Sequence, residues 1–492
     1  MLLRLGLIPL LFFFFFTHFE YRNELPRGVH QWAQADRYAI AARYMEDRSF
    51  WEPASYSVIS DDGEVGVEMP LIQYVSGKLA YWTKSQNKLA FFYRFLSFLI
   101  LFIGFYRLLE RRLKKQKWWV KMAVAILFYS SPILLFYGFN FSPDALSLGL
   151  ILLGMSFLDQ KTDKVNWPLI TSFGLAAAIK TSSGIYLIGY AAFLLWTHRK
   201  KLNKPVVTSL GLIAFIGALL AYYAKSQIIN RNEELWSTLF LASTNPISNT
   251  GDFLHMLKGL WYWKYEYLNG IQWSISILIV LYVLVVKRSF KYTNIKLLYT
   301  IWFIGIVAIL WLFGNQFVNH DYYALATFMP LLIIGLLQLT NRINWNRWVP
   351  AVVLILTGIV SFSYGSNQHF DRMSETCVIN KQAMNFDFEW MRNLKNGIDN
   401  TVDESEKVFV VYGMEPNLSL VYLQRKGIVF NHEEMGREES NFYYWLERRQ
   451  PEYVLCRVKY FELFKSEHNE FVGKSELLIN HPEFVLLKTN GH

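Results

Sequence analysis

Long apolar runs recur along the first three quarters of the chain, and polar segments separate them. A hydrocarbon core about 30 Å thick requires roughly 20 mostly apolar residues per helix, or about 17 when flanking side chains reach the interface. We interpret about eleven runs as transmembrane helices, the shortest two of which could instead form one re-entrant pair. They cover about 5–19, 89–106, 120–138, 143–158, 166–179, 183–197, 205–224, 271–286, 295–313, 322–339 and 348–364.

The Lys and Arg residues of the connecting loops predict the orientation. The loops "RLLERRLKKQKWWVK", "THRKKLNK", "KRSFKYTNIK" and "TNRINWNR" are basic, whereas "NFSPD" and "GNQFVNHD" contain neither residue type. The basic loops are therefore predicted to be cytoplasmic. The C-terminus then lies outside, whether the first run is a retained anchor or a cleaved signal peptide. No small-x-small cleavage site follows that run, which favours an anchor.

Three segments are predicted on the outer side, at about 20–88, 225–270 and 365–492. In the last, short β-rich runs ("KVFVVYG", "GIVF", "YVLCRV", "FVLLK") alternate with helical stretches such as "NFYYWLERR". This alternation predicts a small periplasmic α/β domain with a mainly parallel sheet. It lacks G-x-G-x-x-G, so nucleotide binding is unsupported. Residues 1–364, outer loops included, form the predicted transmembrane domain.

Composition supports a membrane protein, because 53% of the 492 residues are hydrophobic, 17% are aromatic and only 18% are charged. The net charge of +10 is spread over membrane-flanking loops. That distribution fits an anionic lipid surface and argues against nucleic-acid binding, which needs one basic stripe with aromatic platforms. The only cysteines, Cys377 and Cys456, lie in the outer tail, where a disulfide and two packed thiols are both open.

The segment "QADRYAIAARYMED" in the first outer loop spaces small and apolar residues as a helix does. It predicts an amphipathic helix lying along the membrane surface, with Asp36 near its start and Arg43 on the same face. There the helix dipole favours an ionised Asp36, and an ionised carboxylate can accept a proton from an attacking hydroxyl, as a general base does. Pairing with Arg43 or helix capping are the structural alternatives.

Other polar residues gather at the outer helix ends. Glu68, before Pro70 in "EVGVEMPLIQY", is either a helix cap or a second carboxylate or metal ligand. Asp144, in "FNFSPDALSLG", is likewise a cap or a site residue. Lys180, in "AAAIKTSSG", is a basic residue on the outer side, against the usual bias. It fits a lysine that pairs with a phosphate in a cavity, and snorkelling to the interface is the alternative.

The segment "NHDYYALATFMP" places His320, Asp321, Tyr322 and Tyr323 just outside a predicted helix. The two tyrosines fit an interfacial aromatic belt. His320 and Asp321 could bind a metal, but two ligands are too few to define a site. A divalent metal is therefore left open, and no other cofactor is predicted.

The order of these segments resembles that of the GT-C membrane glycosyltransferases, the group that contains protein O-mannosyltransferases and lipid A aminoarabinose transferases. A short first anchor is followed by "DRYAIAARYM", "EMPLIQY", "SPDAL", "AIKTSSG" and "HDYYAL". The resemblance covers the membrane part of the chain. There are two departures. Many relatives have an adjacent Asp-Glu pair where this chain has Gln34-Ala35-Asp36, and a lysine where Met69 precedes the Pro-Leu segment.

The resemblance implies a glycosyltransferase that moves a hexose or pentose from a polyprenyl-phosphate donor to an envelope glycan, lipid or protein acceptor by an inverting displacement. The reaction would take place on the outer face of a bacterial-type inner membrane, with Asp36 as the base. Lys180 would contact the lipid phosphate together with Arg37 or Arg94. His320 and Tyr323 would line the donor pocket. We add Glu68 and Asp144 to these substrate-binding candidates because they lie on the same side.

Two other classes of protein remain to be weighed. A lipid or solute transporter is disfavoured because the polar residues cluster on one side of the membrane and no inverted repeat is visible. A scaffold for envelope assembly without catalytic activity predicts that the outer acidic residues are dispensable.

Overall fold

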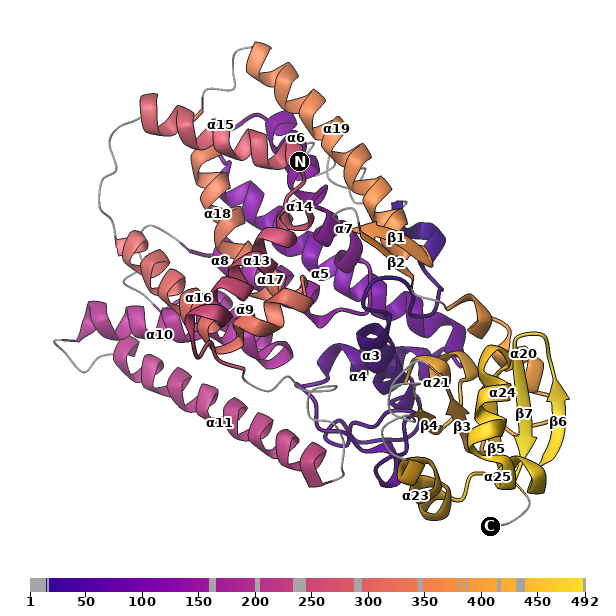
Figure 1. Cartoon of the computed structure of the whole chain (residues 1–492). Coiled ribbons are helices and arrows are strands. Elements are labelled where there is room, and N and C mark those ends of the chain that lie inside the picture. The colour runs from indigo at the N-terminus through magenta and orange to yellow at the C-terminus, as the bar shows by residue number, and fades with distance from the viewer. Residues whose placement is uncertain are drawn as a thin grey trace.

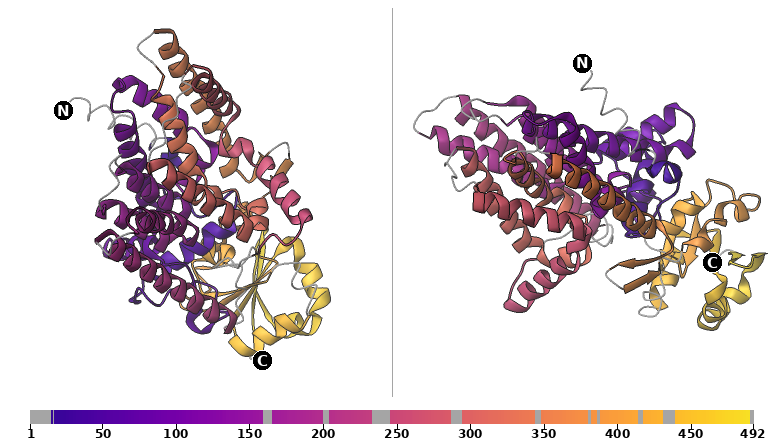
Figure 2. Two further views of the ribbon diagram at one scale, coloured as in Figure 1. Left: turned by 90° about the vertical axis from the view of Figure 1, so that its left-hand side faces the viewer. Right: turned by 90° about the horizontal axis from the view of Figure 1, so that it is seen from above.

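The computed structural model consists mostly of helices, with a small sheet near the C-terminus. In Figure 1 the sheet lies at the lower right and the helices extend away from it to the upper left. Both views in Figure 2 keep the C-terminal part at one end of the molecule. The structure describes residues 15, 17–158, 165–199, 204–232, 245–286, 294–343, 348–379, 382–385, 388–413, 417–430 and 439–489.

Helices follow every predicted span after the first, which lies mostly outside the described residues. They are α5 (Leu89–Arg112), α6 (Trp118–Tyr129), α7 (Pro132–Gly138), α8 (Pro143–Ser156), α9 (Trp167–Ile179), α10 (Gly184–His198), α11 (Lys204–Asn232), α15 (Gly270–Val286), α16 (Asn294–Asn319), α17 (Tyr323–Ala326), α18 (Met329–Thr340) and α19 (Trp348–Met373). Within the described ranges, three helical stretches are long and apolar enough to cross a membrane: Gln86–Arg112, Lys204–Arg231 and Ile295–Asn319. The bent pair of α6 and α7 could form a fourth. The larger number of spans stays a prediction.

The predicted span at 120–138 is broken, because α6 and α7 meet at an angle of 83°. Pro132 is the first residue of α7 and has no N–H to continue the hydrogen bonds of α6. The polar side chains at the break find partners on neighbouring helices. The Ser130 hydroxyl lies 2.6 Å from that of Ser361 on α19. Buried hydrogen bonds of this kind make a broken helix tolerable inside a membrane.

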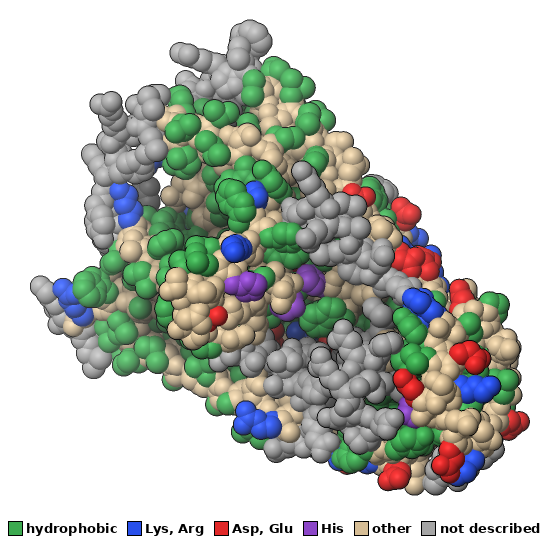
Figure 3. Space-filling view, in the orientation of Figure 1, with side chains coloured by type: hydrophobic (Ala, Val, Ile, Leu, Met, Phe, Trp, Pro, Cys, Tyr) green, Lys and Arg blue, Asp and Glu red, His purple; other side chains and the backbone are tan. Residues whose placement is uncertain are grey.

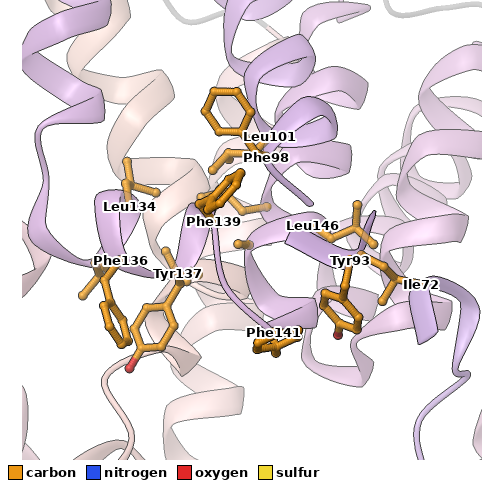
Figure 4. Close-up of a cluster of buried hydrophobic side chains, with 14 of the residues drawn as sticks. Ile72, Tyr93, Phe98, Leu101, Leu134, Phe136, Tyr137, Phe139, Phe141 and Leu146 are labelled. Atoms are coloured by element: carbon orange, nitrogen blue, oxygen red, sulfur yellow. The ribbon is translucent and has the colours of Figure 1, made fainter. Parts of the chain in front are cut away.

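Helices α5 and α8 cross closely at two glycines. A Cβ atom on Gly104 would lie 1.9 Å from the carbonyl oxygen of Gly149, and one on Gly149 would lie 2.6 Å from the Cα of Leu101. Small residues at such a crossing let two membrane helices approach backbone to backbone. The core of the helical part is a cluster of buried hydrophobic side chains, of which Figure 4 labels Ile72, Tyr93, Phe98, Leu101, Leu134, Phe136, Tyr137, Phe139, Phe141 and Leu146.

The loops that are predicted to lie outside form short helices: η1 (Phe19–Tyr21), α3 (Gln31–Arg43), η2 (Asp61–Gly63), α4 (Leu71–Trp82), η3 (Gln86–Lys88), α13 (Thr250–Tyr262) and α14 (Lys264–Tyr267). The helix predicted for "QADRYAIAARYMED" is therefore present as α3. Its predicted amphipathic character is wrong, because most of its side chains are buried on all sides. Its place relative to the membrane surface stays a prediction. Helices α4, α5 and α21 (Leu418–Leu423) pack around it.

The tail contains a five-stranded sheet of order β4-β3-β5-β7-β6. Its strands are β3 (Val408–Val411), β4 (Gly427–Phe430), β5 (Tyr453–Arg457), β6 (Glu476–Asn480) and β7 (Phe484–Lys488). The tail also contains the short helices η5 (Glu389–Met391), α20 (Leu394–Ile398), α23 (Glu439–Arg449), α24 (Val458–Glu467) and α25 (Asn469–Lys474). Strands β3, β4 and β5 are parallel, as predicted, but β6 and β7 are antiparallel because a short turn joins them. A hairpin, β1 (Thr376–Ile379) and β2 (Gln382–Asn385), was not predicted.

Cys377 and Cys456 are buried free thiols, so the disulfide alternative is wrong.

The first outer loop is joined to the edge of this sheet. Ser57 forms a parallel bridge with Gly427 of β4: the Val58 N–H donates to the Gly427 oxygen at 2.8 Å, and the Gly427 N–H donates to the Tyr56 oxygen at 3.0 Å. The loop thereby covers the exposed side of β4, which is an edge strand. In Figure 3 charged side chains are frequent over the tail, and hydrophobic ones dominate the helical part.

Candidate active site

A cavity of about 100 Å³ opens among the helices, beside the first loop. The first loop, the turn after α9, and helices α11, α16 and α17 all contribute to its wall. The lining residues are Glu68, Lys180, Thr181, Ser182, Tyr223, Gln227, Ile309, Phe313, Phe317, Tyr323 and Thr327. Three of the residues predicted from the sequence, Glu68, Lys180 and Tyr323, therefore meet in one place.

Lys180 is the central cation of this cavity. It ends α9, where the chain turns into η4 (Thr181–Ser183), and it is 6% exposed. Its Nζ lies 3.2 Å from Glu68 Oε2, 3.7 Å from Asp144 Oδ1 and 4.9 Å from the ring centre of Tyr323. A snorkelling lysine would reach toward water, so this buried set of contacts supports the cavity interpretation instead.

Glu68 holds the turn after α9 and does not cap α4, whose N-cap is Pro70. Its Oε1 accepts hydrogen bonds from the Thr181 N–H at 3.1 Å and the Thr181 hydroxyl at 3.0 Å, and Arg37 lies 4.0 Å from Oε2. Burial acts to raise the pKa of Glu68, but Lys180, Arg37 and the Thr181 hydrogen bonds outweigh it and hold that pKa below its ordinary value. Glu68 is thus an ionised carboxylate that orients two cations.

Asp144 stands in the first turn of α8, as its Ser-Pro-Asp signature predicts. One oxygen accepts a hydrogen bond from the Ser142 hydroxyl at 3.4 Å. The other, Oδ1, has no hydrogen-bond partner among the described residues and faces Lys180 at 3.7 Å. Asp144 therefore joins the charged cluster around Lys180 in addition to standing at a helix start.

One wall of the cavity is apolar and belongs to a long membrane-type helix. Ile309, Phe313 and Phe317 line it from α16, which departs from helical geometry at Phe313. Elsewhere on α16, Phe303 and Trp311 are exposed, as expected for side chains that face lipid. The cavity thus combines a charged end with a hydrophobic wall that continues into a predicted span.

Asp36 lies on α3, one residue before Arg37, and is 1% exposed. Its Oδ1 accepts a hydrogen bond of 2.9 Å from the side-chain amide of Asn417, which lies in the tail. Its Oδ2 is buried without a hydrogen-bond partner in the part of the chain that the structure describes. Arg43 binds other acids and not Asp36, so the predicted structural pairing is not present.

Burial determines the charge state of Asp36. It raises the pKa of Asp36 to about 7, although the Asn417 hydrogen bond and the charge of Arg37 act to lower it. The expected stabilisation of the ionised form by the helix dipole is not found, because the helix begins at Gln31 and Asp36 lies beyond its first turn. A carboxyl group with this pKa can take up and release a proton near neutral pH.

The fold is similar to those of several solved membrane enzymes. ArnT from Cupriavidus metallidurans bound to undecaprenyl phosphate matches with a TM-score of 0.60 and 12% identity, over 98% of each chain. Its apo state matches with a TM-score of 0.51 and 11% identity, again over 98% of each chain. The arabinofuranosyltransferase AftD from Mycobacteria matches with a TM-score of 0.50 and 11% identity, over 99% of this chain and 40% of AftD. These proteins are GT-C glycosyltransferases.

The chain has the GT-C fold. It is thus a multi-pass helical membrane protein with a C-terminal α/β part. No protein-family model matches the sequence, and a search of curated proteins finds no match. The likeness, at 11 to 12% identity, is one of fold.

His320 is not among the residues that line the cavity. Its ring lies 5.5 Å from that of His30 and 5.7 Å from that of Trp32, and it contacts the ring of Tyr323 at 5.4 Å. The neighbouring Asp321 accepts hydrogen bonds of 2.6 Å from both Tyr137 and Arg372. The described residues include no group of three or more His, Cys, Asp or Glu side chains that could hold a metal ion.

Arg94 lies apart from the Lys180 cluster of the GT-C core. Its guanidinium donates to the main-chain oxygens of Tyr21 and Glu24 and stacks 4.4 Å from the ring centre of Phe141. It therefore holds the start of the first outer loop against α5. Of the two arginines expected beside the lipid phosphate, Arg37 is the one that reaches the cavity cluster.

Several lining residues of the GT-C cavity were not singled out from the sequence. Thr181 and Ser182 follow Lys180 directly in "KTSSG", so the motif that drew attention to the lysine contained them. Tyr223 and Gln227 lie on α11 at a helical spacing, but nothing distinguishes them from other polar residues near a span end. Asn417 carries no sequence signal, since it is 381 positions from Asp36.

Proposed function

We propose that this protein is a glycosyltransferase that moves a sugar from a polyprenyl-phosphate donor to an acceptor hydroxyl of the cell envelope, on a glycan, lipid or protein. The observation that carries the proposal is the cavity that joins the Lys180 cluster to the apolar wall of α16. A lipid phosphate has the same two parts, an anionic head and a long hydrocarbon tail. The GT-C fold supports the same conclusion, since ArnT of that fold binds undecaprenyl phosphate.

The head of the donor would lie beside Lys180. A lysine ammonium has three N–H donors, and Glu68 takes one of them at hydrogen-bond distance. The Ser182 hydroxyl, which lines the cavity and has no partner within the described ranges, is a further donor. Arg37 adds a second positive charge next to Glu68. The hydrocarbon tail would leave the cavity past Phe313, between α11 and α16.

Asp36 would act as the base of an inverting displacement. The acceptor oxygen attacks the anomeric carbon, its proton passes to Asp36 Oδ2, and the bond from that carbon to the phosphate oxygen breaks. The electron pair leaves with the polyprenyl phosphate, whose negative charge Lys180 and Arg37 stabilise. A phosphate is already a competent leaving group, so the reaction needs no nucleotide.

The same proposal assigns the orientation and the division of the chain. Residues 20–88, 225–270 and 365–492 would face the periplasmic side of an inner membrane, as the basic loops predict. Residues 1–364 would bind the donor, and 365–492 would form much of the surface that receives the acceptor. A lipid donor can reach such a site laterally, which explains a reaction centre at the membrane edge.

The test uses the full-length protein reconstituted in liposomes. Binding of undecaprenyl phosphate is measured first, because the reaction releases this lipid whatever the sugar is. We expect wild-type protein to bind it and Lys180→Gln to bind it about 10- to 100-fold more weakly, since a charge-assisted hydrogen bond is lost. Lys121→Gln is the matched control, because Lys121 pairs with Glu110 at 3.0 Å on helices that do not line the cavity.

Transfer is then measured with hexosyl, pentosyl and amino-sugar polyprenyl phosphates and an envelope fraction as acceptor. If Lys180→Gln does not fold, Phe313→Trp narrows the apolar wall without changing any charge and should also weaken lipid binding. A wild-type protein that neither binds the lipid phosphate nor transfers any of these sugars would refute the proposal.

A further inference from the structure

The C-terminal domain contributes one side chain to the immediate surroundings of Asp36. Asn417 is 0% exposed and stands at the N-cap of α21, in the segment that follows β3. Its Nδ2 donates to Asp36 Oδ1 at 2.9 Å. A residue of the last domain thus binds the carboxylate that a helix of the first outer loop presents.

The amide of Asn417 can take only one orientation. Its Oδ1 accepts a hydrogen bond of 2.9 Å from the backbone N–H of Ser57. An N–H can only donate, so an oxygen must face Ser57, and the amide nitrogen must then face Asp36. Two contacts in the first outer loop therefore fix one side chain of the tail, and that side chain fixes Asp36 Oδ1.

The two oxygens of Asp36 have different surroundings as a result. Oδ1 is held by Asn417, while Oδ2 is buried and lacks a hydrogen-bond partner within the described residues. A buried oxygen without a donor is a costly arrangement, and native proteins keep it mainly where another molecule or a proton completes it. Oδ2 is the atom to which the proposed mechanism brings the acceptor proton.

We propose that Asn417 is a positioning residue for sugar transfer, which holds Asp36 so that Oδ2 alone receives the proton of the acceptor hydroxyl. The inference rests on the proposed function and deepens it. The C-terminal domain then completes the reaction centre and does not serve only as a surface for the acceptor. The amide donates to the ionised form of Asp36 and favours it over the protonated form.

The elements packed around α3 bring several titratable groups toward it. They are Tyr74 from α4, beside Tyr44 at the end of α3, and Tyr93 and Arg94 from α5, which act on Arg37 and Tyr38. Lys78 of α4 and Tyr422 of α21 contact the main chain of the first loop instead, at Glu46 and Pro26. The charge that acts on Asp36 itself is that of Arg37, the next residue on the same helix. A substitution of Asn417 leaves the charge of Arg37 in place. A shift in the pH at which Asp36 ionises therefore measures the effect of the Asn417 amide.

The sharpest variant is Asn417→Asp. It keeps the shape of the side chain and an oxygen for the Ser57 N–H, but it replaces the donor that faces Asp36 with a carboxylate oxygen. The matched control is Tyr422→Phe, which removes another hydrogen bond between α21 and the first loop, from Tyr422 to the Pro26 oxygen at 3.2 Å. Both variants, wild type and Asp36→Asn are reconstituted and assayed for transfer between pH 5.5 and 9, a range of about 1.5 to 2 units either side of neutrality.

We expect Asn417→Asp to lower kcat about 10- to 100-fold at neutral pH, with the KM for the lipid donor unchanged within about twofold. The acid limb of its pH profile should move to higher pH, because two neighbouring carboxylates cannot both ionise easily. Tyr422→Phe should keep the wild-type profile. If Asn417→Asp does not fold, Asn417→Ser keeps a hydroxyl donor and should be more active than Asn417→Ala.

The outcomes separate this inference from the proposed function. A wild-type protein without any transfer activity would refute the proposed function, and the role of Asn417 would fall with it. An active wild type together with an active Asp36→Asn would remove Asp36 as the base. An active wild type, an inactive Asp36→Asn and an Asn417→Asp variant with wild-type kcat and pH profile would overturn the positioning role alone. Equal activities of Asn417→Ser and Asn417→Ala would do the same.

Discussion

Asp36→Asn should stabilise the folded protein at neutral pH and, at the same time, abolish sugar transfer. The pKa of Asp36 rises from 3.8 to about 7 on folding because the carboxyl is buried. Each pKa unit corresponds to about 1.4 kcal/mol, so burying the ionised form costs roughly 4 kcal/mol above pH 7. The amide nitrogen that replaces Oδ2 lacks a partner, which costs about 1 to 3 kcal/mol. A net gain of about 1 to 3 kcal/mol remains.

The sign of the pH dependence follows from the same values. The folded state binds the proton of Asp36 more tightly than the unfolded state does, so stability falls as the pH rises from 3.8 to about 7. The advantage of Asp36→Asn over wild type should therefore be complete above pH 7 and shrink as the pH is lowered toward 4. An inactive variant that is more stable than the wild type is the pattern expected for a group that serves function at the expense of stability.

The assay is thermal unfolding of the purified protein, followed by intrinsic fluorescence at pH 5 and pH 8. These two pH values lie roughly 2 units below and 1 unit above the expected pKa of Asp36. Asp47→Asn is the control, because Asp47 is an exposed aspartate of the same loop. Its Tm should equal that of the wild type at both values. A lower Tm of Asp36→Asn at pH 8, or the same difference at pH 5 as at pH 8, would refute the reasoning.

Two further predictions concern activity and folding. The kcat/KM for transfer should fall about tenfold per pH unit below about pH 7, because only ionised Asp36 accepts a proton; a flat profile from pH 5 to 7 would exclude that residue as the base. Gly104→Val should prevent α5 and α8 from packing, because its Cβ would lie 1.9 Å from the carbonyl oxygen of Gly149. The measurement is the yield of monodisperse protein on size exclusion, and a wild-type yield would contradict the close crossing.

Much of the helical part could be predicted from hydropathy alone. A helix must satisfy its own backbone in a membrane, so apolar length translates directly into elements such as α5, α11 and α16. Glu68, Asp144 and Lys180 could be grouped because each stands at the outer end of a helix or next to one. Residues at the same end of neighbouring helices lie at the same depth, and that constraint brought three distant segments together.

Features that depend on side-chain partners far along the chain escaped prediction. The burial of α3 requires the tail to cover it, and Asn417 meets Asp36 only because the sheet docks on the first loop. The resemblance offered Arg94 as an alternative to Arg37 beside the phosphate, whereas in the structure the Nη1 of Arg94 donates to main-chain oxygens of the first loop. The bend between α6 and α7 falls at a Ser-Ser-Pro step inside an apolar run, where average hydropathy does not change enough to reveal it.

The bridge between Ser57 and Gly427 has a consequence for how the protein is made. The ribosome delivers Gly427 370 residues after Ser57, so the first outer loop must wait for the tail before its pairing is complete. Until then the backbone at Tyr56 to Val58 lacks its partner strand, and Asp36 lacks the amide of Asn417. A chain released before β4 is made would leave this segment of the first loop unpaired. The bridge can therefore form only in a chain that has been synthesised past β4.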